Sequence, residues 1–501
     1  FTLTKVGSND VWINSNVIVA NIIVEDGVYG AQGSNALNNV SGTVTVNGGS
    51  VLGTWSNLNI TADIDLNDAR FRARSGALPA EFQLFNGTFT LTGSTIFDVA
   101  NTVDVEIASD IDGGGSLSKV SNGILELSGT NTYTGATSAN NGVLLLNGTH
   151  TGGDSYSITG SATFGGNGST DSTVAVTGAT FAPGDGGAGT LATGNLSLDG
   201  ASTFAFDLDG AATDSVNVTG TVALDGTLTS NVIVDPTQYI ITLIDNDGTA
   251  DATTGQFVGI NDGDTLTFGS AEYRIFYNGG DGNDVILVST APPSTIYVDD
   301  DFTGTDGLFI DGDLEAPGQQ FAVYDVSAFN SVEDALAKYA NYSGTIIVNG
   351  GTYASAIDTT ASSNGAGDID LQFTSDTVNG DGAAISITSF QGDATDSLNT
   401  SLNGTGIELT TTGGDFAGPI SGLGGIVLDD AGAGNTLILS GTNTYSGNTD
   451  VISGTLAVTN VAGSGTGSGD VTVASGSSLI GTGTINGTVT AEDGSFVAPG
   501  L

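Results

Sequence analysis

The sequence predicts an all-β protein built as a right-handed parallel β-helix, a β-solenoid in which successive turns of the chain stack along one axis. Three observations predict this fold. Short runs of Val, Ile, Leu, Thr and Phe alternate with polar residues and end at Asn-Gly, Asp-Gly and Gly-Gly turns. A long stretch of sequence recurs within the chain. Finally, 501 residues are too many for one ordinary compact core, a limit that stacked turns escape.

Each predicted strand has an inner and an outer face, because apolar and polar residues alternate along it. The runs at 42–51, 87–96 and 195–210 show this alternation. Helical periodicity is nearly absent. One short capping helix is predicted at 331–340, where Ser331 suits the N-cap position and the following residues form an apolar face at helical spacing.

The charge balance excludes several partners. The chain holds 55 acidic and 7 basic residues, for a formal net charge of −48. Such a polyanion is a poor partner for nucleic acid, and for the same reason we expect no direct insertion into an anionic membrane. Repulsion on this scale must be screened by salt or neutralised by bound cations, which fits a saline or calcium-containing exterior.

Cysteine and methionine are absent, which excludes disulfides and cysteine-based sites. Residues 1–10 do not have the pattern of a signal peptide, and no apolar run approaches membrane-spanning length. The chain opens and closes in the middle of its pattern. We therefore expect either a processed product or a segment of a larger exported protein, with an incomplete N-terminus and a truncated second solenoid.

The internal repeat organises the chain. Residues 125–146 and 437–458 share their leucines, glycines and polar residues at a constant offset of 312 positions (437 − 125). The recurring residues of the first copy are Leu125, Ser128, Gly129, Asn131, Tyr133, Gly135, Thr137, Gly142 and Leu144. Such self-similarity is typical of a solenoid, in which each turn buries its apolar face only against its neighbours.

The segment 116–146 resembles the autotransporter-associated β-strand repeat of bacterial passenger domains. Lys119 fills the lead-in lysine position of that repeat, and its LxLSGxNTYTGxT core begins at Leu125. The lead-in of the second copy, at 424–430, lacks the lysine. The resemblance implies a right-handed parallel β-helix that is secreted or displayed on a bacterial surface.

A second resemblance sets the domain boundary. The segments 296–304 and 328–353 are similar to the N-terminal cap of pectin-lyase-like β-helices, in which an amphipathic helix covers the open end of the solenoid. Pro292 and Pro293 mark the joint. We therefore predict a first solenoid at 1–290, a joint at 291–296 and a second solenoid at 297–501 that includes the helix at 331–340.

We predict that the protein is not an enzyme. Pectin-lyase-like lyases use arginine or lysine as a base, whereas 342–501 contains no Lys, Arg or His. Lys338 lies in the predicted capping helix, and the single histidine, His150, is interpreted as a solvated turn residue because it adjoins Gly-Thr turns. Carboxylate pairs that suit a glycosidase arise by chance in so acidic a chain. No catalytic residue and no certain cofactor is assigned.

Calcium is the metal that the sequence favours, because oxygen ligands suit Ca²⁺ over transition metals. Residues 279–287 match the RTX nonapeptide, with Asp281 and Asp284 as its candidate ligands. The alternative is a tight glycine-rich turn that leads into the closing strand of the first solenoid. A second group of carboxylates lies near the joint, and it forms either a calcium site or a solvated acidic loop. Its candidate ligands are Asp299, Asp301, Asp306, Asp311 and Asp313.

Three of the seven basic residues lie on one face of one predicted strand, because Arg70, Arg72 and Arg74 alternate with apolar residues. Two interpretations stay open. The arginines pair with the nearby aspartates within 63–68, or they form a basic spot that docks onto an acidic neighbouring subunit and so mediates assembly.

The sequence therefore favours an extracellular structural or adhesive repeat protein of a bacterial cell surface, such as a component of an S-layer lattice, a filament or a stalk. Expected partners are other copies of the chain, in a polymer or lattice, and a polysaccharide or host-surface ligand. The alternative is a carbohydrate-binding or carbohydrate-active β-helix, either with or without a dependence on calcium. Aromatic residues make up only 7% of the chain and both tryptophans, Trp12 and Trp55, lie in the first unit, which favours the structural role.

Overall fold

The structure is a computed structural model of the 501-residue chain. It describes residues 1–75, 81–248, 250–304, 306–311, 321–339, 342–349, 351–353, 357–359, 369–373, 384–387, 389–392, 394, 396–401 and 406–500. The chain divides into two compact units, and each is described by itself. Unit 1 runs from Phe1 to Thr290 and unit 2 from Ala291 to Leu501.

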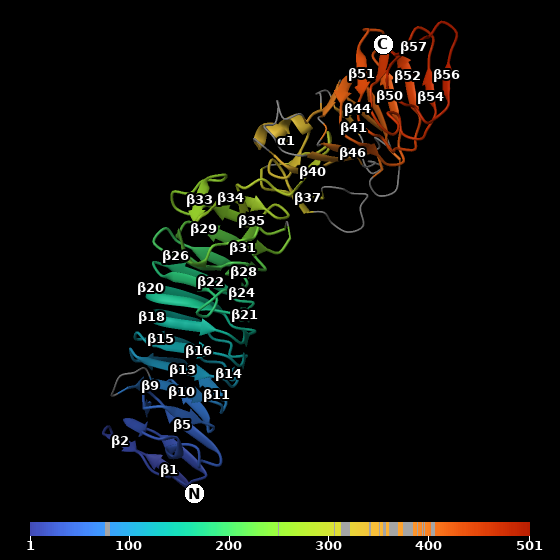
Figure 1. Ribbon diagram of the computed structural model, residues 1–501. Helices are drawn as coiled ribbons and strands as arrows, with labels where there is room; N and C mark the ends of the chain where they lie inside the picture. Colours follow the sequence, from blue (N-terminus) through green and yellow to red (C-terminus); the bar gives the residue numbers. More distant parts are fainter. Residues whose placement is uncertain are drawn as a thin grey trace. The chain divides into compact units, whose positions relative to one another are not determined.

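Unit 1 is a parallel β-helix with three faces, and its strands stack in sequence order (Figure 1). The first face contains β1 (Thr2–Lys5), β3 (Asn21–Val24), β5 (Thr43–Asn47), β8 (Asp63–Asn67), β11 (Phe89–Thr92) and β14 (Ile111–Gly113), and is continued by β17 (Thr130–Asn131), β19 (Thr149–His150), β21 (Ser169–Thr170), β24 (Thr190–Thr193), β28 (Ser215–Val218) and β31 (Ile240–Asn246). The second face contains β2 (Asp10–Ile13), β4 (Val28–Ala31), β6 (Val51–Trp55), β9 (Arg70–Arg74), β12 (Ser94–Val99), β15 (Ser116–Val120), the first parts of β18 (Thr137–Leu146) and β20 (Ser155–Gly166), β22 (Thr173–Thr177), β25 (Leu196–Leu198), β29 (Val222–Leu224) and β32 (Thr253–Gly255). The third face contains β7 (Leu58–Ile60), β10 (Glu81–Phe85), β13 (Val103–Ile107), β16 (Ile124–Leu127), the second parts of β18 and β20, β23 (Thr180–Pro183), β26 (Thr203–Asp209) and β30 (Thr227–Val234). A 3₁₀ turn at Ser34–Ala36 and the short β27 (Ala212–Thr213) lie between these strands.

The register of these strands confirms the predicted all-β solenoid. Residues that meet on neighbouring solenoid turns lie about 20 to 25 positions apart in the chain. On β9 the side chains of Phe71 and Ala73 are fully buried, whereas the arginines of the strand point outward. Alternation along each strand therefore gives the unit one continuous inner core.

Aromatic rings occupy the same inner position on successive solenoid turns. Phe164 pairs in register with Phe181, which pairs with Phe204. Their ring centroids lie 6.1 and 5.6 Å apart, within the range of favourable aromatic contacts. Each turn is thus stabilised mainly by the turns directly beside it.

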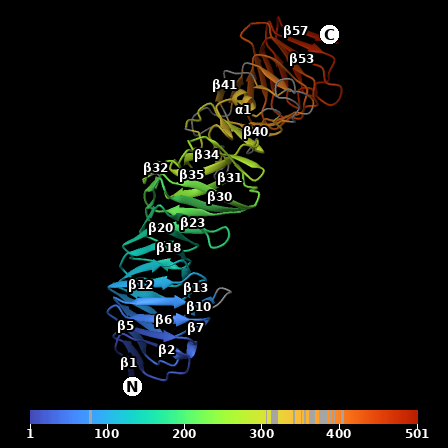
Figure 2. The same cartoon turned by 90° about the vertical axis from the view of Figure 1, so that its left-hand side faces the viewer.

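Antiparallel strands close the last turn of unit 1. β35 (Asp284–Ser289) pairs with β31, and β34 (Ala271–Gly279) pairs with β35 (Figure 2). β33 (Thr265–Phe268) extends the same sheet beyond β34. A parallel stack ends in a strand with unpaired amides and carbonyls, which invites pairing with other chains. The hairpin strands cover that edge.

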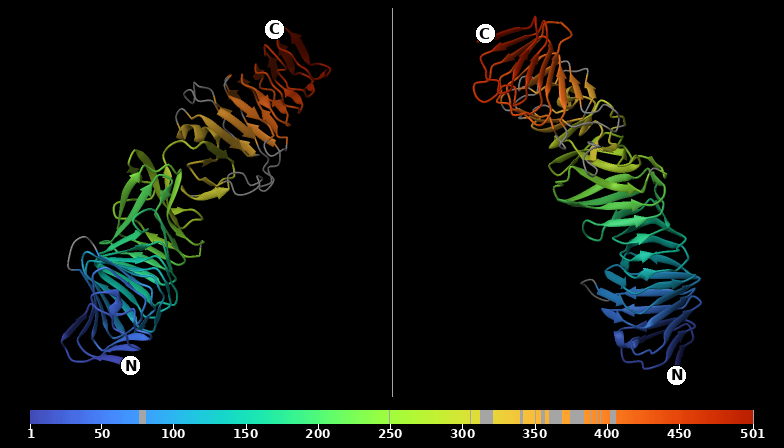
Figure 3. Two further views of the ribbon diagram at one scale, coloured as in Figure 1. Left: turned by 60° about the horizontal axis from the view of Figure 1, so that its bottom comes forward. Right: turned by 90° about the vertical axis from the view of Figure 1, so that its right-hand side faces the viewer.

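Unit 2 is a second parallel solenoid with three faces, and its orange-to-red strands lie side by side in both views of Figure 3. The first face contains β39 (Ala328–Phe329), β36 (Thr295–Val298), β40 (Gly344–Val348), β43 (Ile369–Phe373), β46 (Ser397–Asn399) and β49 (Ile420–Ser421). The second contains β41 (Gly351–Tyr353), β44 (Ala384–Ile387), β47 (Glu408–Thr411), β50 (Ile426–Asp429), β52 (Thr449–Ser453), β54 (Val471–Val473) and β56 (Val489–Ala491). The third contains β42 (Ile357–Asp358), β45 (Phe390–Gly392), β48 (Gly414–Phe416), β51 (Thr436–Leu439), β53 (Thr455–Val458), β55 (Ser478–Gly481) and β57 (Phe496–Pro499). β37 (Phe309–Asp311) and β38 (Phe321–Val323) form a separate antiparallel ribbon.

The single α-helix of the described residues, α1 (Val332–Lys338), packs on the first turn of unit 2. Its N-cap is Ser331, as predicted, and the Ser331 hydroxyl accepts a hydrogen bond from the Asp334 backbone N–H at 3.1 Å. Val332 and Ala335 are buried in the same core as β36. The helix is shorter than the predicted span of 331–340, and Ala340 lies outside the described residues. Membership of the pectin-lyase-like cap type stays a prediction.

Candidate functional site

The repeat motif forms the same buried corner in both units. In unit 1 the side-chain oxygen of Asn131 accepts a hydrogen bond from the Ile111 backbone N–H at 3.2 Å, on the preceding solenoid turn. In unit 2 the side-chain oxygen of Asn443 accepts one from the Ile420 N–H at 2.8 Å. Both asparagines are buried. Each therefore satisfies an amide that would cost about 1–3 kcal/mol if it were buried without a partner.

The motif tyrosines fill the inside of this corner. Tyr133 and Tyr445 are fully buried, and their hydroxyls lie 2.6 Å from the hydroxyls of Thr137 and Thr449 respectively. Burial raises the pKa of Tyr133 to about 12. A buried phenol needs a hydrogen-bond partner, and the threonine four residues later supplies it. This explains the Tyr-x-x-x-Thr spacing of the motif.

Motif glycines in both copies lie where the chain touches the preceding turn. A Cβ atom at Gly129 would stand 2.1 Å from the Ser109 carbonyl oxygen, and one at Gly441 would stand 1.9 Å from the Gly418 carbonyl oxygen. No side chain fits there unless the backbone moves. The glycines are thus required by the distance between neighbouring solenoid turns.

The lead-in lysine of the motif is a buried structural donor. The Lys119 ammonium group donates to three carbonyl oxygens: those of Ser121 at 2.6 Å, Asn141 at 3.0 Å and Val120 at 3.4 Å. Its side chain is fully buried. Burial lowers the pKa of Lys119 to about 8, although the charge of Asp98 acts in the opposite direction. Three N–H donors meet three carbonyl acceptors, so the lysine closes a turn of the chain.

Lys5 does the same on the first turn of unit 1, and sequence reasoning missed it. Its ammonium group donates to the carbonyl oxygens of Gly7, of Asp26 at 2.8 Å and of Val6 at 3.2 Å. The signal was present in the sequence, because LTKVGS at 3–8 parallels LSKVSN at 117–122. The structural lysine therefore occurs twice in unit 1.

Unit 2 closes the corresponding turn with the opposite charge. Leu428 takes the register position of Lys119. Beside it, Asp430 is buried, and its carboxylate accepts hydrogen bonds from the backbone N–H groups of Gly432 at 2.8 Å and Asn435 at 2.6 Å. A donor closes the turn in unit 1 and an acceptor closes it in unit 2, which explains how the second copy dispenses with the lysine.

His150 is buried, so its interpretation as a solvated turn residue is wrong. Its ring stacks on Tyr133 with centroids 4.0 Å apart. Nε2 lies 2.9 Å from the Tyr133 carbonyl oxygen, to which it can only donate, and Nδ1 lies 2.8 Å from the Tyr156 hydroxyl. In the neutral ring Nδ1 is then an acceptor. Burial lowers the pKa of His150, which favours this neutral form.

Acidification is expected to destabilise unit 1 through His150. Because the pKa of the folded histidine lies below its usual value of about 6.5, the unfolded chain binds the proton first, and the contribution of His150 to stability falls as the pH drops below about 6.5. The loss is at most about 1.4 kcal/mol per pH unit. Urea unfolding at about pH 7.5 and 5.5 measures it, and His150→Gln is expected to lose less stability between the two.

An equal loss in the variant and the parent protein would contradict a buried neutral histidine. Burial raises the pKa of Asp214 to about 6 and that of Asp284 to about 7, so these two groups favour folding as the pH falls. Their contributions are the same in both proteins and cancel in the comparison.

The three arginines of β9 converge on one carboxylate. Asp98, on the neighbouring β12, lies 2.6 Å from Arg74, 3.3 Å from Arg70 and 3.7 Å from Arg72. Burial alone would raise the pKa of Asp98, but hydrogen bonds from Arg74 and Ser121 outweigh it and lower the pKa. In the described part of the chain no aspartate within 63–68 forms an ion pair with them, so the local-pairing interpretation named the wrong partner. An assembly contact at these arginines stays a prediction.

Asp281 and Asp284 lie at a hairpin turn. Gly279 at the end of β34 pairs with Asp284 at the start of β35, so the segment 279–287 turns between two antiparallel strands. Asp281 is exposed, whereas Asp284 is buried and accepts a hydrogen bond from the Asn246 N–H at 2.8 Å. Burial raises the pKa of Asp284 to about 7. The geometry is that of a tight turn into a closing strand, and a calcium ion here stays a prediction.

The second group of carboxylates is described in part. Asp299 is buried, and its oxygens accept hydrogen bonds from the Asp301 backbone N–H at 2.9 Å and from the Asn349 side chain at 3.0 Å. Asp301 is exposed and Asp306 half-buried. Asp313 and the side chain of Asp311 lie outside the described residues. Among the residues that the structure does describe, no three acidic or histidine side chains gather as a metal site. Calcium binding by this group stays a prediction.

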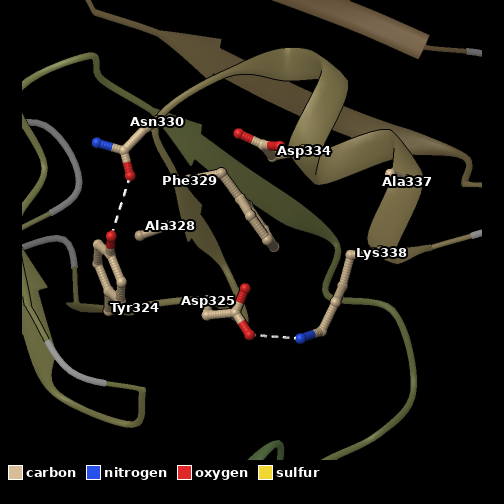
Figure 4. A pocket seen from close by; sticks show the side chains of 8 residues that line it. All are labelled: Tyr324, Asp325, Ala328, Phe329, Asn330, Asp334, Ala337 and Lys338. Carbon is tan, nitrogen blue, oxygen red and sulfur yellow. Dashed lines mark hydrogen bonds and ion pairs between the residues drawn. The ribbon is translucent and has the colours of Figure 1, made fainter.

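A pocket of about 410 Å³ lies beside α1 in unit 2 (Figure 4). Lys338 from the helix forms an ion pair with Asp325 at 2.5 Å, and the Tyr324 hydroxyl donates to the Asn330 side-chain oxygen at 3.1 Å. Lys338 is the only basic residue of 291–501. Its ammonium group is thus paired with a carboxylate at the edge of the pocket.

Two segments of the chain match a known family. The family model of the passenger-associated-transport-repeat matches residues 117–146 and 431–458, which are the segments that form the buried corners. A search among curated proteins gave no match. No helix of the described ranges is long and apolar enough to cross a membrane. The two matches and the β-solenoid fold together support an autotransporter passenger-type repeat of a secreted or surface protein.

Proposed function

We propose that the protein is a structural or adhesive component of a bacterial cell surface, built from passenger-type solenoids and without catalytic activity. The observation that carries the proposal is the use of the motif residues. Asn131, Lys119 and Gly129 contact neighbouring solenoid turns, and the Tyr133 ring stacks on His150 of the next turn. Because these residues hold neighbouring turns together, they form a scaffold, and the groups that bind a partner lie on the outer surface.

The acidic composition supports the same role. A net charge of −48 keeps separate chains soluble during export, and cations of the medium then screen the repulsion between assembled copies. In this proposal the protein self-associates into a lattice or filament, and Ca²⁺ held by Asp299 or Asp284 and their neighbours strengthens the folded chain.

Immunogold electron microscopy of intact producing cells tests the proposal. Antibodies against unit 1 are expected to label the outer surface in ordered arrays. Label that appears only after the cells are opened would contradict a surface role. Label on the surface with no regular spacing would support an adhesin and contradict a lattice.

A further inference from the structure

The two tryptophans of the chain lie together on the outside of unit 1. Trp12 on β2 and Trp55 on β6 belong to the second face of the solenoid (Figure 2). Their ring centroids lie 6.0 Å apart, with the planes at 81°. Both side chains are half-buried, so part of each ring faces solvent. Two large aromatic rings side by side on an outer face form an apolar patch, and such patches often mark binding surfaces.

Two glycines on successive solenoid turns make room for the Trp12 ring. A Cβ atom at Gly30 would lie 2.1 Å from Cε3 of the indole, and one at Gly53 would lie 2.8 Å from Cη2. The six-membered ring therefore rests directly on the backbone of two strands. Any other residue at Gly30 would displace it, so the glycines provide a fitted seat for the ring.

The arginines of β9 continue this surface on the next strand. Gly53 pairs in register with Arg72, and Trp55 pairs with Arg74, at the usual strand separation of about 4.8 Å. Three guanidinium groups face the single carboxylate of Asp98, which leaves two positive charges in excess. The Nε of Arg72 is buried and donates no hydrogen bond to any described residue. A chain of net charge −48 thus concentrates three of its seven basic residues beside its two tryptophans.

We propose that this Trp-Arg patch, formed by Trp12, Trp55, Arg70, Arg72 and Arg74, binds an acidic saccharide, a glycan chain that carries uronate carboxylates. The C–H face of a pyranose ring is flat and apolar and packs on an indole. A carboxylate on the same sugar accepts paired hydrogen bonds from a guanidinium fork. The inference goes beyond the structural role proposed above and does not depend on it.

The patch fits a saccharide better than a second copy of the chain. A stable protein interface covers about 800 Å² on each partner. The patch lies on four neighbouring strands, β2, β4, β6 and β9, and is only roughly 15–20 Å long, so it is smaller than such an interface. An oligosaccharide of three or four residues matches the length of the patch and brings only a few charges. The arginines therefore serve a glycan rather than an acidic neighbouring subunit.

Tryptophan fluorescence of the full chain tests the proposal, because Trp12 and Trp55 are the only tryptophans and both belong to the patch. Titration with tetragalacturonate is expected to change the emission saturably. Galactotetraose, which lacks the carboxylates, is expected to bind at least about tenfold more weakly. No change with tetragalacturonate, or equal binding of the two sugars, would overturn the proposal.

Variants separate the parts of the patch. Arg72→Gln is expected to weaken tetragalacturonate binding about tenfold, as measured by calorimetric titration. Trp55→Leu is expected to weaken both sugars. Arg274→Gln is the matched control, because Arg274 lies on β34, far along the unit, over the ring of Phe276. Unchanged binding by Arg72→Gln and Trp55→Leu, with unfolding midpoints equal to the parent, would place the ligand elsewhere and overturn the assignment.

Two further measurements distinguish a saccharide ligand from a protein partner. Poly-aspartate of similar charge is expected to bind much more weakly than tetragalacturonate, because it offers no sugar face to the indoles. Equal binding would indicate an acidic peptide site and overturn the proposal. Sedimentation of the parent and of Arg72→Gln is expected to show the same oligomeric state. Loss of an oligomer in the variant would instead assign the patch to a second copy.

Discussion

Replacement of Gly129 by alanine is expected to destabilise unit 1 by about 3 kcal/mol or more. The added methyl group would stand 2.1 Å from the Ser109 carbonyl oxygen, and a backbone atom cannot rotate away as a flexible side chain can. The neighbouring turn would have to shift, and its register contacts with it. Urea unfolding followed by tryptophan fluorescence measures the effect, because both tryptophans lie in unit 1.

The matched control for this substitution is Gly187→Ala. A Cβ atom at Gly187 has no heavy atom within 4 Å, and the residue is not among the glycines of positive φ. Its cost is expected to stay within about 0.5 kcal/mol. Equal effects of the two substitutions would contradict the close approach of turns at Gly129.

Replacement of Lys119 by methionine is expected to cost unit 1 about 2–4 kcal/mol. Methionine keeps the apolar stem but removes the ammonium group, so the carbonyl oxygens of Ser121 and Asn141 lose the donor that lies within 3.0 Å of each. Buried carbonyls without partners are costly because water cannot replace the lost donor. Differential scanning calorimetry measures the shift of the unit 1 transition.

Lys338→Met serves as the control for the loss of a lysine. The Lys338 side chain is 32% exposed and its Asp325 partner 37% exposed, so the ion pair is largely solvated. Its loss is expected to cost no more than about 1 kcal/mol. A Lys119→Met effect as small as this would show that the lead-in lysine does not hold the turn.

Much of the fold follows from local pattern. Alternation at 70–74 correctly predicts Phe71 inside and the arginines outside, because inner and outer residues of a strand differ by one position. The N-cap at Ser331 is correct for a similar reason, since the cap and its hydrogen-bond partner lie three residues apart. The repeat at 125–146 and 437–458 correctly predicts stacked turns, because in a solenoid each turn buries its apolar face against its neighbours and equal sequences meet equal surroundings.

Contacts between solenoid turns could not be predicted from the sequence. Asp98 lies 24 to 28 residues from the arginines that it binds, and the length of a solenoid turn varies, so no spacing rule identifies the partner. His150 looked like part of a loop, yet it pairs in register with the buried Asn131. The Trp12 ring packs on two glycines that come from two later turns, Gly30 and Gly53. Each of these features depends on register, which pattern alone does not determine.

Immunogold electron microscopy of intact cells, repeated after treatment with a calcium chelator, tests directly whether these solenoids form a surface structure. We expect antibodies against unit 1 to label the outer surface in regular arrays, and we expect the chelator to disperse the arrays if Ca²⁺ strengthens the chain as proposed. Arrays that survive chelation would contradict the proposed role of Ca²⁺ and would leave the proposed solenoid scaffold unaffected. A protein found only inside the cells would contradict the central claim that these passenger-type solenoids form a surface structure.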